Sequence, residues 1–275
     1  MRALLSVCSM TVRERKIKSV ALVCDMCSRI PDSTARIRHT GTMTEEAPQG
    51  VRARARAELL ADVSRIARSH LAEAGAAELS VRAIARELGL ASSALYRYFP
   101  SRDALLTQLI IDAYDELGAA VEVAEAAVDR AELAERFRTI CHAVRDWART
   151  NPHEYALIYG SPLVGYAAPD DTIDSALRVA RVLIDLASEI PASGLVLRSK
   201  DGLDPMLVEQ LGTANALVGV EADLDVLALG VELWAQLFGF VSFELFGTFH
   251  NSFDPADALF VHQVEMAIAA FGLDG

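Results

Sequence analysis

Residues 83–99 read AIARELGLASSALYRYF, the pattern of a short helix, a turn at Gly89 and a second short helix that ends in aromatic side chains. Helices of about eight residues are not stable alone in water, because nucleating a helix costs more than so few hydrogen bonds return. They need longer helices to pack on, and the stretches 52–74 and 102–126 supply two. The sequence therefore predicts a compact helix-turn-helix at this point of the chain.

Helix start and stop signals around these residues support that arrangement. Gly75 can end the preceding helix, and Ser80 can cap the N-terminus of the first short helix. Pro100 stops the second short helix, and Ser101 can cap the helix that follows. We expect five side chains of the pair to face the core: Ala83, Ile84, Leu88, Leu95 and Phe99.

The remainder of the chain also repeats apolar residues at spacings of three and four, with prolines between the repeats and no useful alternating β pattern. Further helices are expected, with boundary errors of about 2–4 residues, at 129–150, 152–159, 171–190, 204–218, 223–247 and 255–271. The predicted fold class is all-α. An N-terminal three-helix helix-turn-helix domain, residues 51–101, is followed by a larger helical domain, residues 102–275.

Residues 1–50 lack sustained periodicity and are predicted to be a disordered extension, with Met43 a candidate for the true start of translation. Cys24 and Cys27 form a CxxC in this stretch. A zinc site needs about four ligands, and no second pair follows nearby, so we interpret the motif as coincidence and expect no cofactor. The four cysteines form no disulfide framework, which favours a reducing, cytoplasmic location.

The formal charge of −12 is unevenly spread along the chain. Residues 52–102 hold nine arginines against five carboxylates, and residues 1–51 carry a net charge of +3, so residues 103–275 carry −19. A basic front and an acidic rear indicate that one part of the chain meets a polyanion and the rest does not.

The outer side of the second short helix has the chemistry for that polyanion to be double-stranded DNA. Serine hydroxyls can bind phosphates or base edges, an alanine methyl can touch a thymine methyl, and tyrosine offers a ring and a hydroxyl to the sugar-phosphate wall. Arginines at the start of the neighbouring helices can neutralise phosphates. The candidate DNA contacts are Ser92, Ser93, Ala94, Tyr96, Arg97 and Tyr98, with Arg102 and an arm of Arg52, Arg54 and Arg56.

The string LSVRAIARELGLASSALYRYFPSRDALL, residues 79–106, resembles the DNA-binding segment of the tetracycline-repressor-like (TetR/AcrR) transcriptional regulators. The resemblance implies that Tyr96 and Tyr98 contact DNA and that residues 92–94 face the groove. It also implies that Ser80 is a cap near the phosphates. Arg102 stands where the family usually has lysine, an exchange that keeps the charge and changes the hydrogen-bond geometry.

By the same resemblance, the domain at 102–275 is expected to dimerise and to bind a small hydrophobic effector. Large apolar residues cover more than one face of the last two expected helices, and a surface helix needs only one stripe. The excess predicts a homodimer interface through the C-terminal helices. No ligand residue is assigned. Pocket candidates, each more often ordinary core, are Phe137, Cys141, Trp147, Tyr155, Tyr159, Tyr166 and Trp234, with His142 and His153 as polar anchors.

Other classes of function find little support in the sequence. No GxSxG, HExxH, GxGxxG or Walker motif occurs, so we expect no enzyme. No run of 18 or more uncharged apolar residues occurs, so we expect no membrane partner. The predicted function is a ligand-responsive repressor that binds a palindromic operator as a homodimer. The alternative is a helical protein-interaction module without sequence-specific DNA binding.

Overall fold

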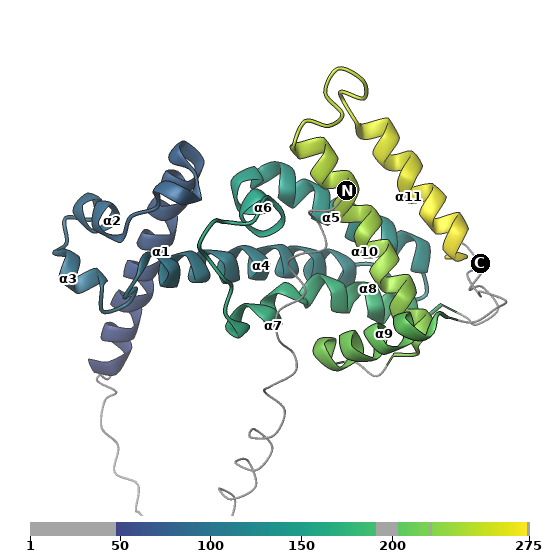
Figure 1. Ribbon diagram of the computed structural model, residues 1–275, viewed down its shortest axis with the longest axis horizontal. Coiled ribbons are helices and arrows are strands. Elements are labelled where there is room, and N and C mark those ends of the chain that lie inside the picture. The colour runs from purple at the N-terminus through teal and green to yellow at the C-terminus, as the bar shows by residue number, and fades with distance from the viewer. Residues whose placement is uncertain (1–47, 191–202, 220–221, 274–275) are drawn as a thin grey trace, which may run out of the picture. The chain divides into compact units, whose positions relative to one another are not determined.

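The computed structural model describes residues 48–190, 203–219 and 222–273, with side chains from residue 53 onward. Every regular element in these residues is a helix (Figure 1). The predicted disordered extension at 1–50 lies outside the described residues except for its last three, which already belong to the first helix. Met43 and the Cys24/Cys27 pair lie outside them as well.

The helix-turn-helix is formed by short elements between two long helices. α1 spans Pro48–Ala74, four residues earlier than expected, and is followed by the 3-10 turn η1, Ala76–Glu78. The short pair is α2, Val81–Glu87, and α3, Ser92–Leu95, and the long helix α4 spans Arg102–Ala126. We call α1 to α3 and α4 up to residue 110 the head, and the described chain from 111 to 273 the body.

The predicted caps are present in the head. Ser80 Oγ accepts a hydrogen bond from the Ala83 backbone N–H at 3.4 Å, and Ser101 Oγ accepts one from Ala104 at 3.0 Å. Gly89 has a φ of +66°, a left-handed conformation that glycine adopts without strain. These local signals fix where the short helices begin and how the chain turns between them.

α3 is shorter than the sequence predicts. It ends at Leu95, and residues 96–98 form turns in which the backbone N–H groups of Tyr98 and Phe99 both reach the Leu95 carbonyl at 3.0 Å. Pro100 disfavours helical backbone only at the residue before it, Phe99, so it does not account for the end of α3 at Leu95. Tyr96 and Tyr98 are therefore presented by a turn, and not by a regular helix.

The head has its own hydrophobic core, built as predicted on Ile84, Leu95 and Phe99. Ala83 and Leu88, also expected inside, are only half-buried, and the fully buried small residue of α2 is Ala85. The first half of α4 belongs to this core and its second half to the core of the body. Packing therefore continues through α4, and the domain boundary between residues 101 and 102 stays a prediction.

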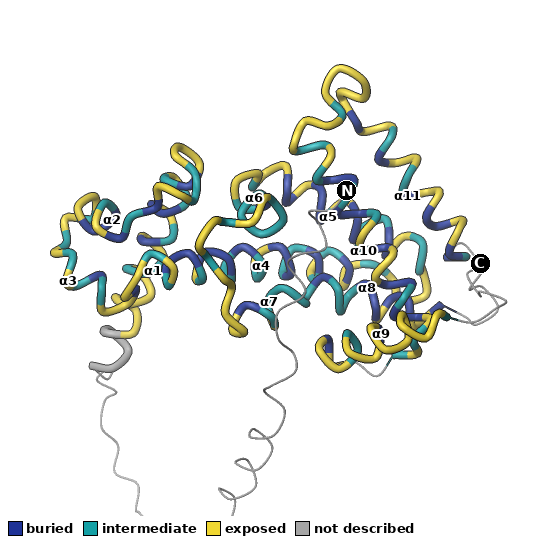
Figure 2. The backbone as a smooth tube through the Cα atoms, in the orientation of Figure 1, coloured by how far each residue is buried: buried dark blue, intermediate teal, exposed yellow. Residues whose placement is uncertain are grey.

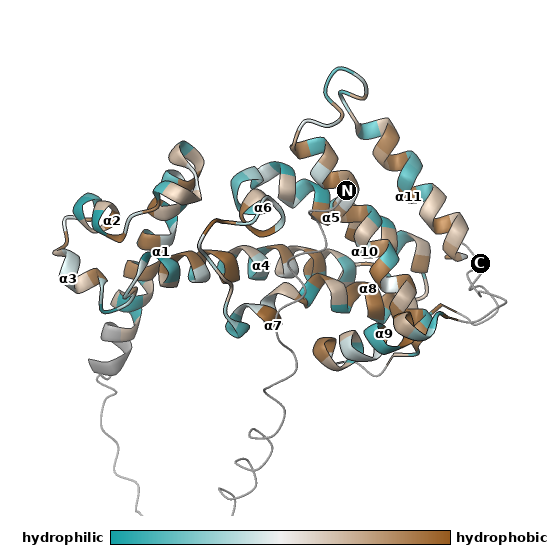
Figure 3. Ribbon diagram, viewed as in Figure 1, coloured by the Kyte–Doolittle hydropathy of each residue, from teal (hydrophilic) through white to brown (hydrophobic). Residues whose placement is uncertain are grey.

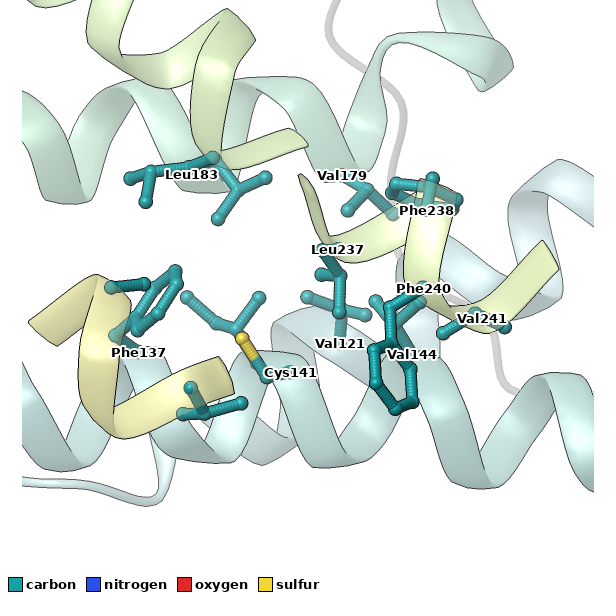
Figure 4. Packing of buried hydrophobic residues seen from close by; sticks show 14 of the residues in the cluster. Val121, Phe137, Cys141, Val144, Val179, Leu183, Leu237, Phe238, Phe240 and Val241 are labelled. Carbon is teal, nitrogen blue, oxygen red and sulfur yellow. The ribbon is translucent and has the colours of Figure 1, made fainter. Parts of the chain in front are cut away.

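The body consists of helices that pack on the second half of α4 or on one another. They are α5 (Leu133–Thr150), α6 (Pro152–Tyr159), η2 (Asp170–Thr172), α7 (Ile173–Ala176), α8 (Arg178–Ser188), α9 (Pro205–Val218), α10 (Leu224–Leu245) and α11 (Asp257–Phe271). The helix expected at 171–190 is divided, because Leu177 separates α7 from α8. Buried residues lie along the inner sides of α4, α5 and α10 (Figure 2), and Figure 4 shows Phe137, Cys141, Leu237 and Phe240 in this packing.

Two buried arginines hold the body together, and the sequence reading did not identify them. Arg136 donates to Glu125 at 2.6 Å and to Glu189 at 2.7 Å, joining α4, α5 and the end of α8. Arg145 donates to Glu244 at 2.6 and 2.7 Å and to Asp257 at 3.0 Å, joining α5, α10 and α11. Such pairs fix the geometry of the helices they join, because removing one partner leaves a buried charge without compensation.

α10 is the most apolar long helix of the described chain (Figure 3), and by length and composition alone it could cross a membrane. The core helix of a soluble protein meets the same criterion. Leu233, Leu237 and Val241 of α10 lie in the core of the body, which accounts for much of its apolar character. The expectation that no membrane partner is involved stays a prediction.

Candidate nucleic-acid interface

The surface formed by α3 and the turn that follows it contains most of the predicted DNA contacts. Ser93, Arg97 and Tyr98 are exposed, whereas Ser92 and Ala94 are half-buried. A short helix and turn that together display hydroxyl, guanidinium and phenol groups can present both base-reading and phosphate-binding chemistry to a DNA groove.

Tyr96 has two roles in this surface. It is half-buried, and its ring packs against the hydrophobic core of the head. Removing the whole ring would therefore disturb the core as well as any DNA contact, whereas removing the hydroxyl alone would leave the packing in place.

The start of α1 lies beside the turn after α3. The Arg56 guanidinium lies over the Tyr98 ring, 5.6 Å from its centroid. Arg54 is exposed on the same helix, and the side chain of Arg52 lies outside the described residues. The structure thus places one arginine of the predicted arm directly against a predicted tyrosine contact, by a cation–π interaction.

Arg102 is more constrained than the sequence suggests. Its side chain is 34% exposed, and one terminal nitrogen donates to the Ala76 carbonyl of η1 at 2.6 Å. A second terminal nitrogen lies 3.5 Å from Asp103, and the buried Nε has no partner within the described residues. Arg102 therefore links α4 to η1, and only part of its guanidinium remains available to a phosphate.

The structure also shows cations that the sequence reading left out. Arg82 and Arg86 are exposed on α2, the helix that crosses the DNA backbone in a helix-turn-helix. Their spacing of four residues places them on one face, which is the signal that could have identified them. Ser80, the predicted cap near the phosphates, is half-buried at the start of the same helix.

Of the candidate effector residues, Phe137 and Cys141 line a small cavity formed by described residues. The gap beside Phe137 and Cys141 measures about 10 Å³, which is barely the space of one water. His142 and His153, considered as polar anchors, are exposed. Tyr166 packs on the core of the head, and its hydroxyl lies 2.9 Å from Thr107 Oγ1.

Tyr155, Tyr159 and Trp234 form a packed cluster with Phe238 on α6 and α10, whereas Trp147 of α5 lies in the core of the body. The ring centroids of Tyr159 and Phe238 are 4.4 Å apart, and those of Trp234 and Phe238 are 5.4 Å apart. Burial raises the pKa of Tyr155 to about 12 and moves the pKa of Tyr159 upward as well. Both phenols therefore stay neutral at physiological pH and can only act as hydrogen-bonding or apolar groups.

Two family models match the chain. One, described as bacterial regulatory proteins of the tetR family, matches residues 65–109. The other, described as a tetracyclin repressor-like C-terminal domain, matches residues 137–267. The first match covers the helix-turn-helix, and the second covers most of the body.

Similar proteins agree with these matches. An HTH-type transcriptional regulator of Mycobacterium tuberculosis and one of Mycobacterium bovis are each 38% identical over 201 residues, which is 73% of this chain and 86% of theirs. The solved structure of a proposed regulatory protein, SCO4313, has 33% identity and a TM-score of 0.65, covering 78% of this chain and 98% of that one. A Rhodococcus protein of unknown function shares the fold at 20% identity, with a TM-score of 0.58, covering 77% and 94%.

A helix-turn-helix head joined by one long helix to an all-helical body is the architecture of a DNA-binding transcription factor. The identity to the mycobacterial regulators, which extends over most of their length, defines the family. The chain belongs to the tetR family of bacterial regulatory proteins. It is a DNA-binding transcriptional regulator, in a family of non-enzymatic proteins.

Proposed function

We propose that this regulator is a cytoplasmic, ligand-responsive repressor that binds a near-palindromic operator as a homodimer. The observation that carries the proposal is the exposed surface of Ser93, Arg97 and Tyr98, with Arg56 beside it. In this proposal the groove-facing side chains hold the operator and block transcription, while arginines on α1, α2 and α4 bind phosphates.

The proposed dimer forms through α10 and α11. An exposed or half-buried seam runs along α10 at spacings of three and four residues and ends at the residue after the helix. It consists of Ala228, Val231, Ala235, Gly239, Ser242 and Phe246. Val261 and Met266 expose apolar side chains on α11. Small residues in such a seam let two helices approach closely, and a twofold axis makes the same seam meet itself.

Gly239 gives specific support to this seam. A Cβ atom added there would meet no other atom of the chain within 4 Å, so the fold of one subunit does not require glycine at this position. A glycine in the middle of a helix costs about 0.5–1 kcal/mol relative to alanine. In the proposed dimer, the absence of a side chain at Gly239 lets the helix of a second copy approach closely.

The proposed effector is a small hydrophobic molecule that binds in the body. The cluster of Tyr159, Trp234 and Phe238 supplies aromatic surface with few polar groups, as ligand sites usually do. The effector needs to prefer only the state that does not bind DNA. A coupling of about 1–3 kcal/mol weakens DNA binding by about 5–150-fold.

The test is an in vitro selection of genomic DNA fragments on the full-length purified protein. A palindromic site should be enriched by the native protein and much less by Ser93→Asp, which places a negative charge at the exposed groove surface. Thr150→Asp, an exposed substitution on α5 in the body, is the matched control. No enriched site with folded, ligand-free protein would overturn the proposal and favour a protein-interaction module. A bound effector that leaves operator affinity unchanged would remove the ligand-response part.

A further inference from the structure

A groove beside the head is explained neither by the helix-turn-helix nor by the dimer. It lies between α1 and α4 and has a volume of about 790 Å³, within the range of small-molecule sites. It contrasts with the gap of about 10 Å³ in the core of the body. The lining residues come almost entirely from the two long helices, with Tyr98 and Phe99 at one end.

The groove combines an apolar lining with charged side chains. Its apolar part is made by Ala57, Leu60, Ala61 and Phe99. Leu60 is half-buried and the two alanines are exposed, so the groove is open to solvent. An aromatic or aliphatic group of a ligand can therefore enter the groove without displacing the core of the head.

The acidic groups on the α4 side are already occupied. Asp112 accepts hydrogen bonds from Ser64 at 3.0 Å and from Gln108 at 2.8 Å. Glu116 pairs with Arg68, donor to acceptor 2.9 Å. The carboxylates of this side are thus engaged by neighbours, and they give a ligand cation little to bind.

The cations at the other side are more available. Within the described chain Arg65 pairs with Asp62, and both side chains are more than half exposed, so the pair is weak. Arg56 is exposed, and its guanidinium lies on the Tyr98 ring. The groove therefore offers apolar surface next to guanidinium groups that can donate hydrogen bonds to an anion.

We propose that the groove between α1 and α4 binds a small amphiphile, which has an apolar part the size of an aromatic ring and one anionic group. We also propose that this ligand weakens DNA binding. The apolar part of the ligand lies over Leu60 and Phe99, and its anionic group binds at the end of the groove where Arg56 lies. Because Arg56 and Tyr98 also belong to the candidate DNA interface, ligand and DNA compete for the same side chains. The binding is independent of the proposed function, whereas the competition rests on it.

The binding test uses anilinonaphthalene sulfonate, an anionic aromatic probe, titrated into the full-length protein by calorimetry. Ala61→Phe fills the groove from an exposed position, and Ala57→Phe does so one turn earlier. Ala72→Phe is the matched control, because Ala72 is exposed on α1 and does not line the groove. We expect one site per chain, at least tenfold weaker binding in both groove variants and less than a twofold change in the control.

Further comparisons test the chemistry of the site. Arg56→Ala should weaken binding of the sulfonate probe by severalfold and have little effect on the uncharged analogue phenylnaphthylamine. Unchanged binding in both groove variants would overturn the proposal, since the probe would then bind elsewhere, for example at the exposed apolar seam of α10. Thermal melting of each variant checks that the head is folded.

The competition test uses an operator fragment obtained by the selection described above. The probe should weaken operator binding by the native protein and by Ala72→Phe, but not by Ala61→Phe. If the probe binds in the groove and operator affinity is unchanged, the regulatory half of the proposal is wrong and the binding site stands. If no operator is found, the repressor proposal fails, and the calorimetric result still decides the groove.

Discussion

Asp115 and Glu116 are consecutive residues of α4, and their carboxylates bind arginines from different parts of the molecule. Asp115 accepts from Arg178 of α8 in the body at 3.1 Å, and Glu116 accepts from Arg68 of α1 in the head at 2.9 Å. A rotation of α4 that changes one ion pair must change the other as well. α4 is thus the element through which a change in the body can reach the head.

The first prediction concerns the fit of Arg178 against α4. A Cβ at Gly118 would lie 2.7 Å from Nε of Arg178, so Gly118→Ala must displace a side chain that binds Asp115 and Glu122. We expect a loss of about 1–3 kcal/mol in the free energy of unfolding, measured in urea. Gly212→Ala, in open space inside α9, should instead gain about 0.5–1 kcal/mol. Equal effects would contradict the packing described for Arg178.

The second prediction concerns Arg102 and is measured with the selected operator. Arg102→Ala should weaken binding to all sequences and flatten the dependence of log K on log salt by about 1. Because Arg102 donates to the Ala76 carbonyl, the variant should also melt at a lower temperature. Arg102→Lys keeps the charge and should preserve most of the salt slope. An unchanged slope in Arg102→Ala means that this residue does not contact phosphate.

The third prediction concerns the proposed dimer seam. Gly239→Arg places a long charged side chain in the seam, and its Cβ atom would meet no atom of its own subunit within 4 Å. We expect sedimentation to show a dimer for the native protein and a monomer for this variant, because an unpaired charge is costly in an apolar interface. Gly212→Arg, equally open on α9, should remain a dimer. Monomeric native protein at micromolar concentration would count against the seam.

The fourth prediction concerns stability in acid. A hydrogen bond from Arg136 is the main cause that holds the pKa of Glu189 below its usual value, and Arg130 adds to the effect. A carboxylate with a lowered pKa in the folded state stabilises the fold above its unfolded pKa, about 4.3, and this contribution is lost as the pH falls through the folded value. We therefore expect the free energy of unfolding to decrease below about pH 4.3.

Substitution separates this contribution from general acid destabilisation. Glu189→Gln should be less stable than the native protein near neutral pH and should lose less on acidification. Glu132→Gln, an exposed substitution near the start of α5, serves as the control and should follow the native profile. Nearby Glu125 also binds Arg136 and Arg130, and it is unchanged in both variants. An identical loss in Glu189→Gln and in the native protein would exclude the assigned contribution.

The sequence was a good guide to the head because its signals are local. Ser80, Ser101, Gly89 and Pro100 act within a few residues, so helix starts, turn and stop could be read directly from spacing. The length of α3 was overestimated, because no local signal in the sequence marks its end at Leu95. The exposed pair Arg82 and Arg86 was accessible to the same reasoning.

Features that depend on distant residues were not predictable. Arg102 meets a carbonyl 26 residues earlier, and Arg145 meets Glu244 at a separation of 99 residues. Periodicity identifies the buried face of a helix but does not reveal which neighbour it meets or which charge the neighbour carries. The same limit applies to the α1–α4 groove, which arises only where two helices separated by the whole helix-turn-helix come together.

Cys141 lies at the centre of the body, fully enclosed, and burial raises the pKa of its thiol. Alkylating reagents attack the thiolate, so this sulfur reacts only when the surrounding helices separate. If the cysteines at positions 8, 24 and 27 are replaced by serine, the rate at which Cys141 is alkylated measures how readily the core opens. With those three replacements, the Cys141 thiol distinguishes an effector that opens the body from one that leaves it closed.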